Sequence, residues 1–124
     1  IGSLTRKVEL ATQLGTYQSS LTDFKYLRKI WKQNTEEERL LGVSLTGILD
    51  NEMLSSNNCG LAGILSGLKS VSIKANDKLS KKMGINASTS ITCVKPSDTV
   101  SQLDIVPITS AQFAVITKTH LHSL

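Results

Sequence analysis

Residues 61–83 read LAGILSGLKSVSIKANDKLSKKM and predict the longest helix of the chain. Gly84 follows as a typical helix stop, and the last turns carry Lys78, Lys81 and Lys82, whose charge suits the carboxyl end of a helix. Apolar side chains recur through the segment at helical spacing, at Leu61, Ile64, Leu65, Leu68, Val71, Ala75 and Leu79. The pattern therefore predicts one long amphipathic helix over these residues.

A predicted strand lies on each side of this helix. Residues 43–49 are dense in apolar and β-branched side chains, end before a turn-forming Asp50, and predict a strand buried on both faces. Gly47 inside it would let another backbone or a ligand approach closely. Residues 87–94 predict a second strand. Strand, long helix and strand together favour a right-handed βαβ crossover with parallel strands, and hence the α/β fold class.

The chain before the first strand predicts shorter helices. Ser3 can cap a helix that stops at Gly15, with residues 16–20 as a polar connection. The apolar face of this helix is expected to comprise Leu4, Val8, Ala11 and Leu14. The start of the chain at Ile1, already within helix-like sequence, is interpreted as a start in mid-protein.

A second short helical segment is predicted after Asp23, which can serve as its cap. Its stripe of large side chains is expected to pack in the core and comprises Phe24, Leu27 and Trp31. Residues 35–38, TEEE, have the S/T-x-x-E form of a capping box and predict a helix from there to Leu41, stopped by Gly42. Residues 55–58 are predicted to form a polar loop.

Composition and charge suit one globular domain. The 124 residues carry a net charge of +4, and hydrophobic side chains make up 40% of them. No apolar stretch approaches the ~20 residues that span a bilayer, so we expect no membrane partner and a cytoplasmic location. Basic residues are spread along the chain, and only one aromatic cluster, Phe24, Tyr26 and Trp31, lies among them. Solvated helix faces therefore explain the charge better than a nucleic-acid site, and no nucleic-acid partner is expected.

Cysteine and histidine give weak signals for chemistry. Cys59 and Cys93 lack C-x-x-C spacing and are interpreted as structural thiols. His120 and His122 form an H-x-H pair without acidic or thiol partners, so no metal site is predicted.

The segment most typical of a binding site is residues 92–103, TCVKPSDTVSQL. The strand that ends at Val94 is broken by Pro96, and Ser97 can cap the helical turn that follows. Unpaired backbone N–H groups and the positive end of the helix dipole suit a phosphate there, and Lys95 adds a further donor. In α/β sheets, ligands bind at the carboxyl ends of the strands, which is where this turn is predicted to lie.

Three runs of sequence together resemble one family. They are residues 10–31 (LATQLGTYQSSLTDFKYLRKIW), 34–50 (NTEEERLLGVSLTGILD) and 83–103 (MGINASTSITCVKPSDTVSQL). In order and spacing they resemble the adenosylcobalamin-dependent ribonucleoside-triphosphate reductases, the class II ribonucleotide reductases of the monomeric type. The resemblance implies that residues 1–103 are a C-terminal portion of the family's ten-stranded α/β barrel.

The resemblance also implies a role for the turn. The family's KPSGTV segment corresponds to residues 95–100, so the phosphates of a ribonucleoside triphosphate are expected to bind Pro96, Ser97, Asp98, Thr99 and Val100. Asp98 stands where the class II pattern has glycine, and its carboxylate would repel phosphate.

The whole enzyme is expected to make deoxyribonucleotides, the precursors of DNA, by radical chemistry with adenosylcobalamin and a thioredoxin-like thiol reductant. By the same resemblance, the radical cysteine and the cobalamin site belong to motifs that this sequence lacks. The chain therefore contains no predicted catalytic residue and is expected to be inactive alone. Residues 104–124 depart from the family and are interpreted as a frameshifted or truncated tail, in which residues 113–117 alternate like a strand.

Two other hypotheses stay open. The chain could be a stand-alone phosphate- or nucleotide-binding module without catalysis, or a basic protein that touches nucleic acid. Because strands cut from a barrel expose edges and apolar faces, the fragment hypothesis predicts a marginally stable or aggregation-prone chain.

Overall fold

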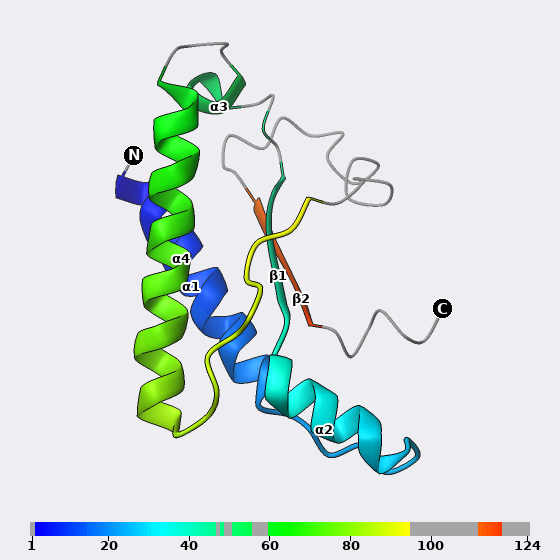
Figure 1. The fold of residues 1–124 in the computed structure, drawn as a ribbon. Helices are drawn as coiled ribbons and strands as arrows, with labels where there is room; N and C mark the ends of the chain where they lie inside the picture. Colours follow the sequence, from blue (N-terminus) through cyan, green and yellow to red (C-terminus); the bar gives the residue numbers. More distant parts are fainter. Residues whose placement is uncertain (1, 47, 49–50, 56–59, 95–111, 118–124) are drawn as a thin grey trace.

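The computed structural model describes residues 2–46, 48, 51–55, 60–94 and 112–117. They form a small, mostly helical domain (Figure 1). The elements are, in order, α1 (Gly2–Ser19), α2 (Lys29–Glu38), β1 (Leu41–Thr46), α3 (Glu52–Ser55), α4 (Leu61–Met83) and β2 (Gln112–Thr117). The described residues do not close into a barrel, so the predicted α/β class holds only as one strand–helix–strand unit within a helical domain.

Helix α4 confirms the prediction for residues 61–83 at both ends. Gly84 adopts a left-handed conformation with φ of 66°, and its amide donates to the carbonyl of Lys81. The next amide, that of Ile85, donates to the carbonyl of Ser80, which completes a glycine-type helix ending. Lys81 and Lys82 lie in the last turn, as predicted.

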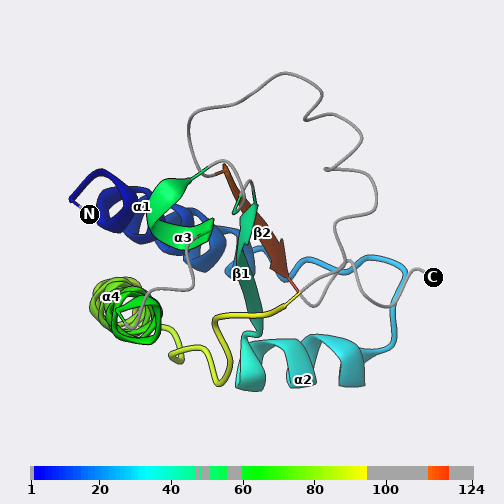
Figure 2. The ribbon, with the colours of Figure 1, turned by 90° about the horizontal axis from the view of Figure 1, so that it is seen from above.

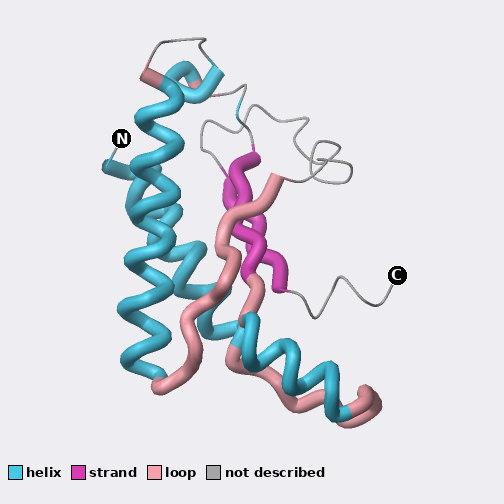
Figure 3. The backbone as a smooth tube through the Cα atoms, in the orientation of Figure 1, coloured by secondary structure: helices cyan, strands magenta, loops and turns pink. Residues whose placement is uncertain are grey.

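Strand β1 and the segment that follows α4 run parallel, as the βαβ prediction required. The Val43 amide donates to the Ile91 carbonyl at 2.8 Å, and the Cys93 amide donates to the Val43 carbonyl at 3.2 Å. A single parallel bridge, between Val43 and Thr92, results. Residues 85–94 are otherwise an extended loop along the strands (Figure 3). The predicted second strand is therefore confirmed in position and direction but is largely unpaired.

The opposite edge of β1 pairs with β2. The pairing is antiparallel, from Leu41 opposite Thr117 to Thr46 opposite Gln112. Because Val43 directs its amide and carbonyl toward residues 91 and 93, the hydrogen bonds to β2 must come from the other edge of β1. The strand expected in the tail is thus present, and β1 lies between two partners. Leu41, Gly42 and Val43 are buried in succession, whereas Ser44, Leu45 and Thr46 are half-buried, so the predicted burial on both faces is found only in the first half of β1.

Two apolar clusters form the core. In the first, Leu4, Val8, Leu54 and Leu68 join α1, α3 and α4. The second joins α1 to the strands and comprises Ala11, Leu41, Val43 and Ile91. Helices α1 and α4 lie together on one side of the strands, whereas α2 projects away from them (Figure 2).

Helix α1 is longer than predicted, and it buries Leu4, Val8 and Ala11 of the predicted apolar face but not Leu14. It continues through Gly15 to Ser19, so the predicted stop at Gly15 and the connection over residues 16–20 are wrong. The buried positions are Leu4, Val8, Ala11, Thr12, Gly15, Thr16 and Ser19. Leu14 falls outside this helical stripe and is 63% exposed. Gly15 lies instead on the buried side of the helix.

Helix α2 contradicts four predictions. It begins at Lys29, after Arg28 rather than Asp23, and buries none of its residues, so the stripe that includes Leu27 and Trp31 is not core. Residues 35–38 form its last turn instead of a capping box, and the Thr35 hydroxyl donates back to the Trp31 carbonyl at 2.7 Å. The chain then turns at Arg39, which has φ of 42°. The helix therefore ends at Glu38, three residues before Leu41, the last residue of the predicted helix.

Polar side chains fill the contact between α1 and α4. Asn76 is 1% exposed, and its Nδ2 donates to Thr16 Oγ1 at 2.9 Å and to Ser88 Oγ at 3.0 Å. The Ser88 amide donates to Asn76 Oδ1 at 2.9 Å. Other small polar residues of α1 and α4 are fully or nearly fully buried, namely Thr12, Ser72 and Ser80. Asn76 thus ties α4 both to α1 and to the loop that leads to the parallel segment.

Replacing Asn76 with alanine is expected to destabilise the chain by about 2–4 kcal/mol, because two hydroxyls and the Ser88 amide lose their partner in a buried place. Urea unfolding of the full chain measures this. Lys78→Ala, an exposed change on the same helix, should stay within ~0.5 kcal/mol of the wild type. Equal effects of the two changes would contradict the role given to Asn76.

Two glycines of the α4 region are expected to respond to alanine with opposite signs. Gly84→Ala should cost about 1 kcal/mol because φ is positive there, whereas Gly67→Ala should stabilise by ~0.5–1 kcal/mol because it lies inside a helix. A Cβ at either position meets no atom within 4 Å, so sterics do not confuse the comparison. Thermal unfolding of both variants gives the sign, and a stabilised Gly84→Ala variant would refute the assigned cap.

Candidate functional site

A pocket of about 400 Å³ lies between the helices and the carboxyl ends of β1 and of the parallel segment. Its size falls within the range of small-molecule sites. The apolar part of its wall comes from α1, β1 and its following turn, α4, and the end of the segment. These residues include Val8, Leu45, Ile48, Leu65, Leu68 and Val94. The location is the edge at which α/β units bind ligands.

The pocket also has a few polar groups. Ser44 and Thr92 contribute hydroxyls from two neighbouring, parallel backbones, and Cys93 contributes a half-buried free thiol. Lys69, on an exposed position of α4, is the one cation among the lining residues that the structure describes. No carboxylate or imidazole belongs to the lining residues that the structure describes. The arrangement can therefore hold an apolar body with an anionic group, but its described walls offer no acid–base pair for catalysis.

The residues predicted to bind phosphate, Pro96, Ser97, Asp98, Thr99 and Val100, lie outside the described residues. The described segment ends at Val94, which lines the pocket and lies two residues before Pro96 in the sequence. The structure thus describes the strand end that leads toward the predicted site and the pocket beside it.

Of the remaining candidate residues, only Cys93 lies within the described part of the chain. Cys93 lies in the segment predicted as the second strand. It is free and half-buried, and it lines the pocket. Cys59, His120, His122 and Gly47 lie outside the described residues. In the part of the chain that is described, no three His, Cys, Asp or Glu side chains gather as a metal site, and no helix is long and apolar enough to cross a membrane.

Sequence reasoning missed a buried arginine at the junction of α1 and α2. Arg39 is 8% exposed, and its Nη1 donates to the carbonyl of Ser19, in the last turn of α1, at 2.8 Å. Its Nε has no hydrogen-bond partner in the described structure. The positive charge suits a helix carboxyl end. A single arginine after three glutamates carried no sequence signal for this contact.

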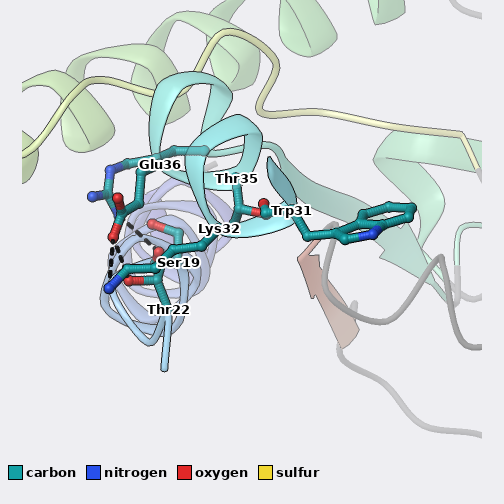
Figure 4. A network of polar contacts seen from close by, with 7 residues as sticks. Ser19, Thr22, Trp31, Lys32, Thr35 and Glu36 are labelled. Atoms are coloured by element: carbon teal, nitrogen blue, oxygen red, sulfur yellow. Dashed lines mark hydrogen bonds and ion pairs between the residues drawn. The ribbon is translucent and has the colours of Figure 1, made fainter. Parts of the chain in front are cut away.

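A second polar network joins α2 to the turn that follows α1. Thr22 Oγ1 donates to Glu36 Oε1 at 2.8 Å, and the Lys32 ammonium lies 3.9 Å from the same oxygen (Figure 4).

The Asn76 network was also missed by sequence reasoning, although its i, i+4 series of small polar residues, Ser72, Asn76 and Ser80, is visible in the sequence. Such a series is ordinarily a solvated face, and here it is buried.

Comparisons of this chain with protein-family models, with curated proteins and with solved structures found no match. The geometry of the pocket and the motifs of the sequence are therefore the grounds on which a function can be inferred.

The pocket is expected to bind an apolar dye that carries an anionic group, such as anilinonaphthalene sulfonate. Replacing Lys69 with alanine should weaken binding about two- to fivefold, as expected for losing one exposed ion pair. Fluorescence titration measures this, with Lys74→Ala as the control, because Lys74 is exposed on the same helix but does not line the pocket. Equal weakening by both variants would show that the dye binds elsewhere.

Proposed function

We propose that this chain is part of a B12-dependent ribonucleoside-triphosphate reductase and forms the wall that holds the substrate's phosphates. The observation that carries this role is the parallel pairing of Val43 with Thr92. It brings the carboxyl ends of two backbones to one edge, immediately before the KPSDTV sequence of residues 95–100. In the proposed ten-stranded barrel, β1 and residues 90–94 would be neighbouring parallel strands, and α4 would be their crossover helix.

Phosphate binding would use the turn itself. Backbone amides after Pro96, together with the hydroxyls of Ser97 and Thr99, are suitable donors for phosphate oxygens. Asp98 adds a negative charge to the same turn, so we expect weaker phosphate binding than with glycine in its place. The adjacent pocket has room for an uncharged part of a ligand, and Lys69 supplies a positive charge at its wall.

The described residues do not fit the cofactor that this function implies. A pocket of about 400 Å³ cannot enclose a cobalamin, which is several times larger than a nucleoside. The described part of the lining also lacks the acid–base groups that reduction of the ribose requires. Cobalamin binding, radical formation and reduction by a thioredoxin-like thiol would therefore belong to other parts of a longer, cytoplasmic enzyme, and the proposed role of this chain is limited to binding.

A stand-alone phosphate-binding module is the second candidate. The observation that favours it is the closure of two apolar clusters and the Asn76 network within the described residues. Coding DNA next to the gene separates the candidates. An adjoining upstream frame that encodes a radical cysteine supports the reductase, whereas a start codon directly before Ile1 supports the module.

Binding of tripolyphosphate and of ribonucleoside triphosphates tests the phosphate site that both candidate functions require. Asp98→Gly is expected to tighten binding about fivefold or more by removing about 1 kcal/mol of repulsion, and Ser97→Ala should weaken it to a similar degree. Isothermal titration calorimetry measures both, with Ser70→Ala, an exposed change on α4, as the control. A chain that binds neither ligand even with glycine at position 98 would rule out a phosphate site at this turn.

A further inference from the structure

The start of α2 and the turn before it combine exposed aromatic rings with positive charge. Tyr26 is 97% exposed and Trp31 is 36% exposed. Four cations lie among them in the sequence, all on exposed positions, namely Lys25, Arg28, Lys29 and Lys32. We call these six residues the basic aromatic surface.

This surface is not part of the folded core. Helix α2 buries none of its residues and projects away from α1 and α4 (Figures 1 and 2). In the close view, Trp31 points away from the side chains of Lys32, Glu36 and Thr22, which hold the other side of the helix (Figure 4). Trp31 was expected to pack in the core, but the structure leaves both Trp31 and Tyr26 exposed beside these cations.

The charges on α2 do not stabilise it through the helix dipole. Cations stand at its start, and Glu36, Glu37 and Glu38 stand at its end, which is the reverse of the order that the helix dipole favours. Among the described residues, Lys25, Arg28 and Lys29 make no ion pair, and Lys32 makes only a 3.9 Å contact with Glu36. Three exposed cations are thus available for an anionic partner.

We propose that the basic aromatic surface binds single-stranded nucleic acid. Cations spaced along a surface follow a phosphate backbone, and exposed aromatic rings stack on unpaired bases regardless of sequence. An acidic protein could use the cations but has less use for two exposed rings, so the combination favours nucleic acid. This site is separate from the turn at residues 95–100 and does not depend on the proposed reductase function.

Fluorescence of Trp31 tests the proposal directly, because it is the chain's single tryptophan. We expect oligothymidine of about 15 nucleotides to quench it at low salt, with affinity that falls as salt rises. The double change Arg28→Ala with Lys29→Ala should weaken binding at least tenfold and reduce the salt slope by about 1.4, as for two lost phosphate contacts. Tyr26→Ala should weaken binding about tenfold by removing a stacking partner.

The matched control removes two exposed cations from α4, by Lys74→Ala with Lys78→Ala, and should change affinity less than twofold. Ser97→Ala should leave the quenching unchanged, which separates this site from the phosphate turn. No quenching at low salt, or equal weakening by the α4 control, would overturn the proposal. Equal binding of polyglutamate would also overturn it and identify the surface as one for acidic proteins.

Discussion

The contact of Asn76 with Thr16 and Ser88 is the interaction on which the rest of the structure depends. One buried amide holds three polar groups from two other segments at 2.9–3.0 Å. Leaving any of them without a partner inside the protein would cost more than the bond itself contributes. This requirement fixes how α4 lies on α1 and where the chain turns after α4. The loop then runs alongside β1, where the Thr89 amide also donates to the Glu38 carbonyl at 3.0 Å.

That direction determines the candidate site. With Ser88 held by Asn76, residues 90–93 reach the edge of β1 and bond to Leu41 and Val43 in parallel. The carboxyl ends of both backbones then lie together, and the pocket opens beside them. The small residues between α1 and α4 therefore affect the shape of the pocket without lining it, because they set the position of the segment that forms one of its walls.

The elements that followed simple rules were predictable. Helix α4 had an apolar period and a glycine at its end, and β1 and its parallel partner followed from the strand–helix–strand order.

The predictions that failed have physical causes as well. The capping-box pattern of residues 35–38 occurs equally well in a last turn, and buried Ser, Thr and Asn inside helices look like solvated faces because only their tertiary partners reveal them. The antiparallel partner of β1 comes from a tail that the predicted crossover did not include. For the phosphate turn itself the prediction stands untested, since residues 95–100 lie outside the described residues.

Native-state hydrogen exchange of the Ser88, Val43 and Cys93 amides tests this dependence most directly. If Asn76 sets the position of the parallel segment, all three amides are slow in the wild type, and all three lose protection together in Asn76→Ala while the amides in the middle of α4 stay protected. A Ser88 amide that exchanges as fast as in an unstructured peptide, or Val43 and Cys93 amides that stay slow in the variant, would contradict the account.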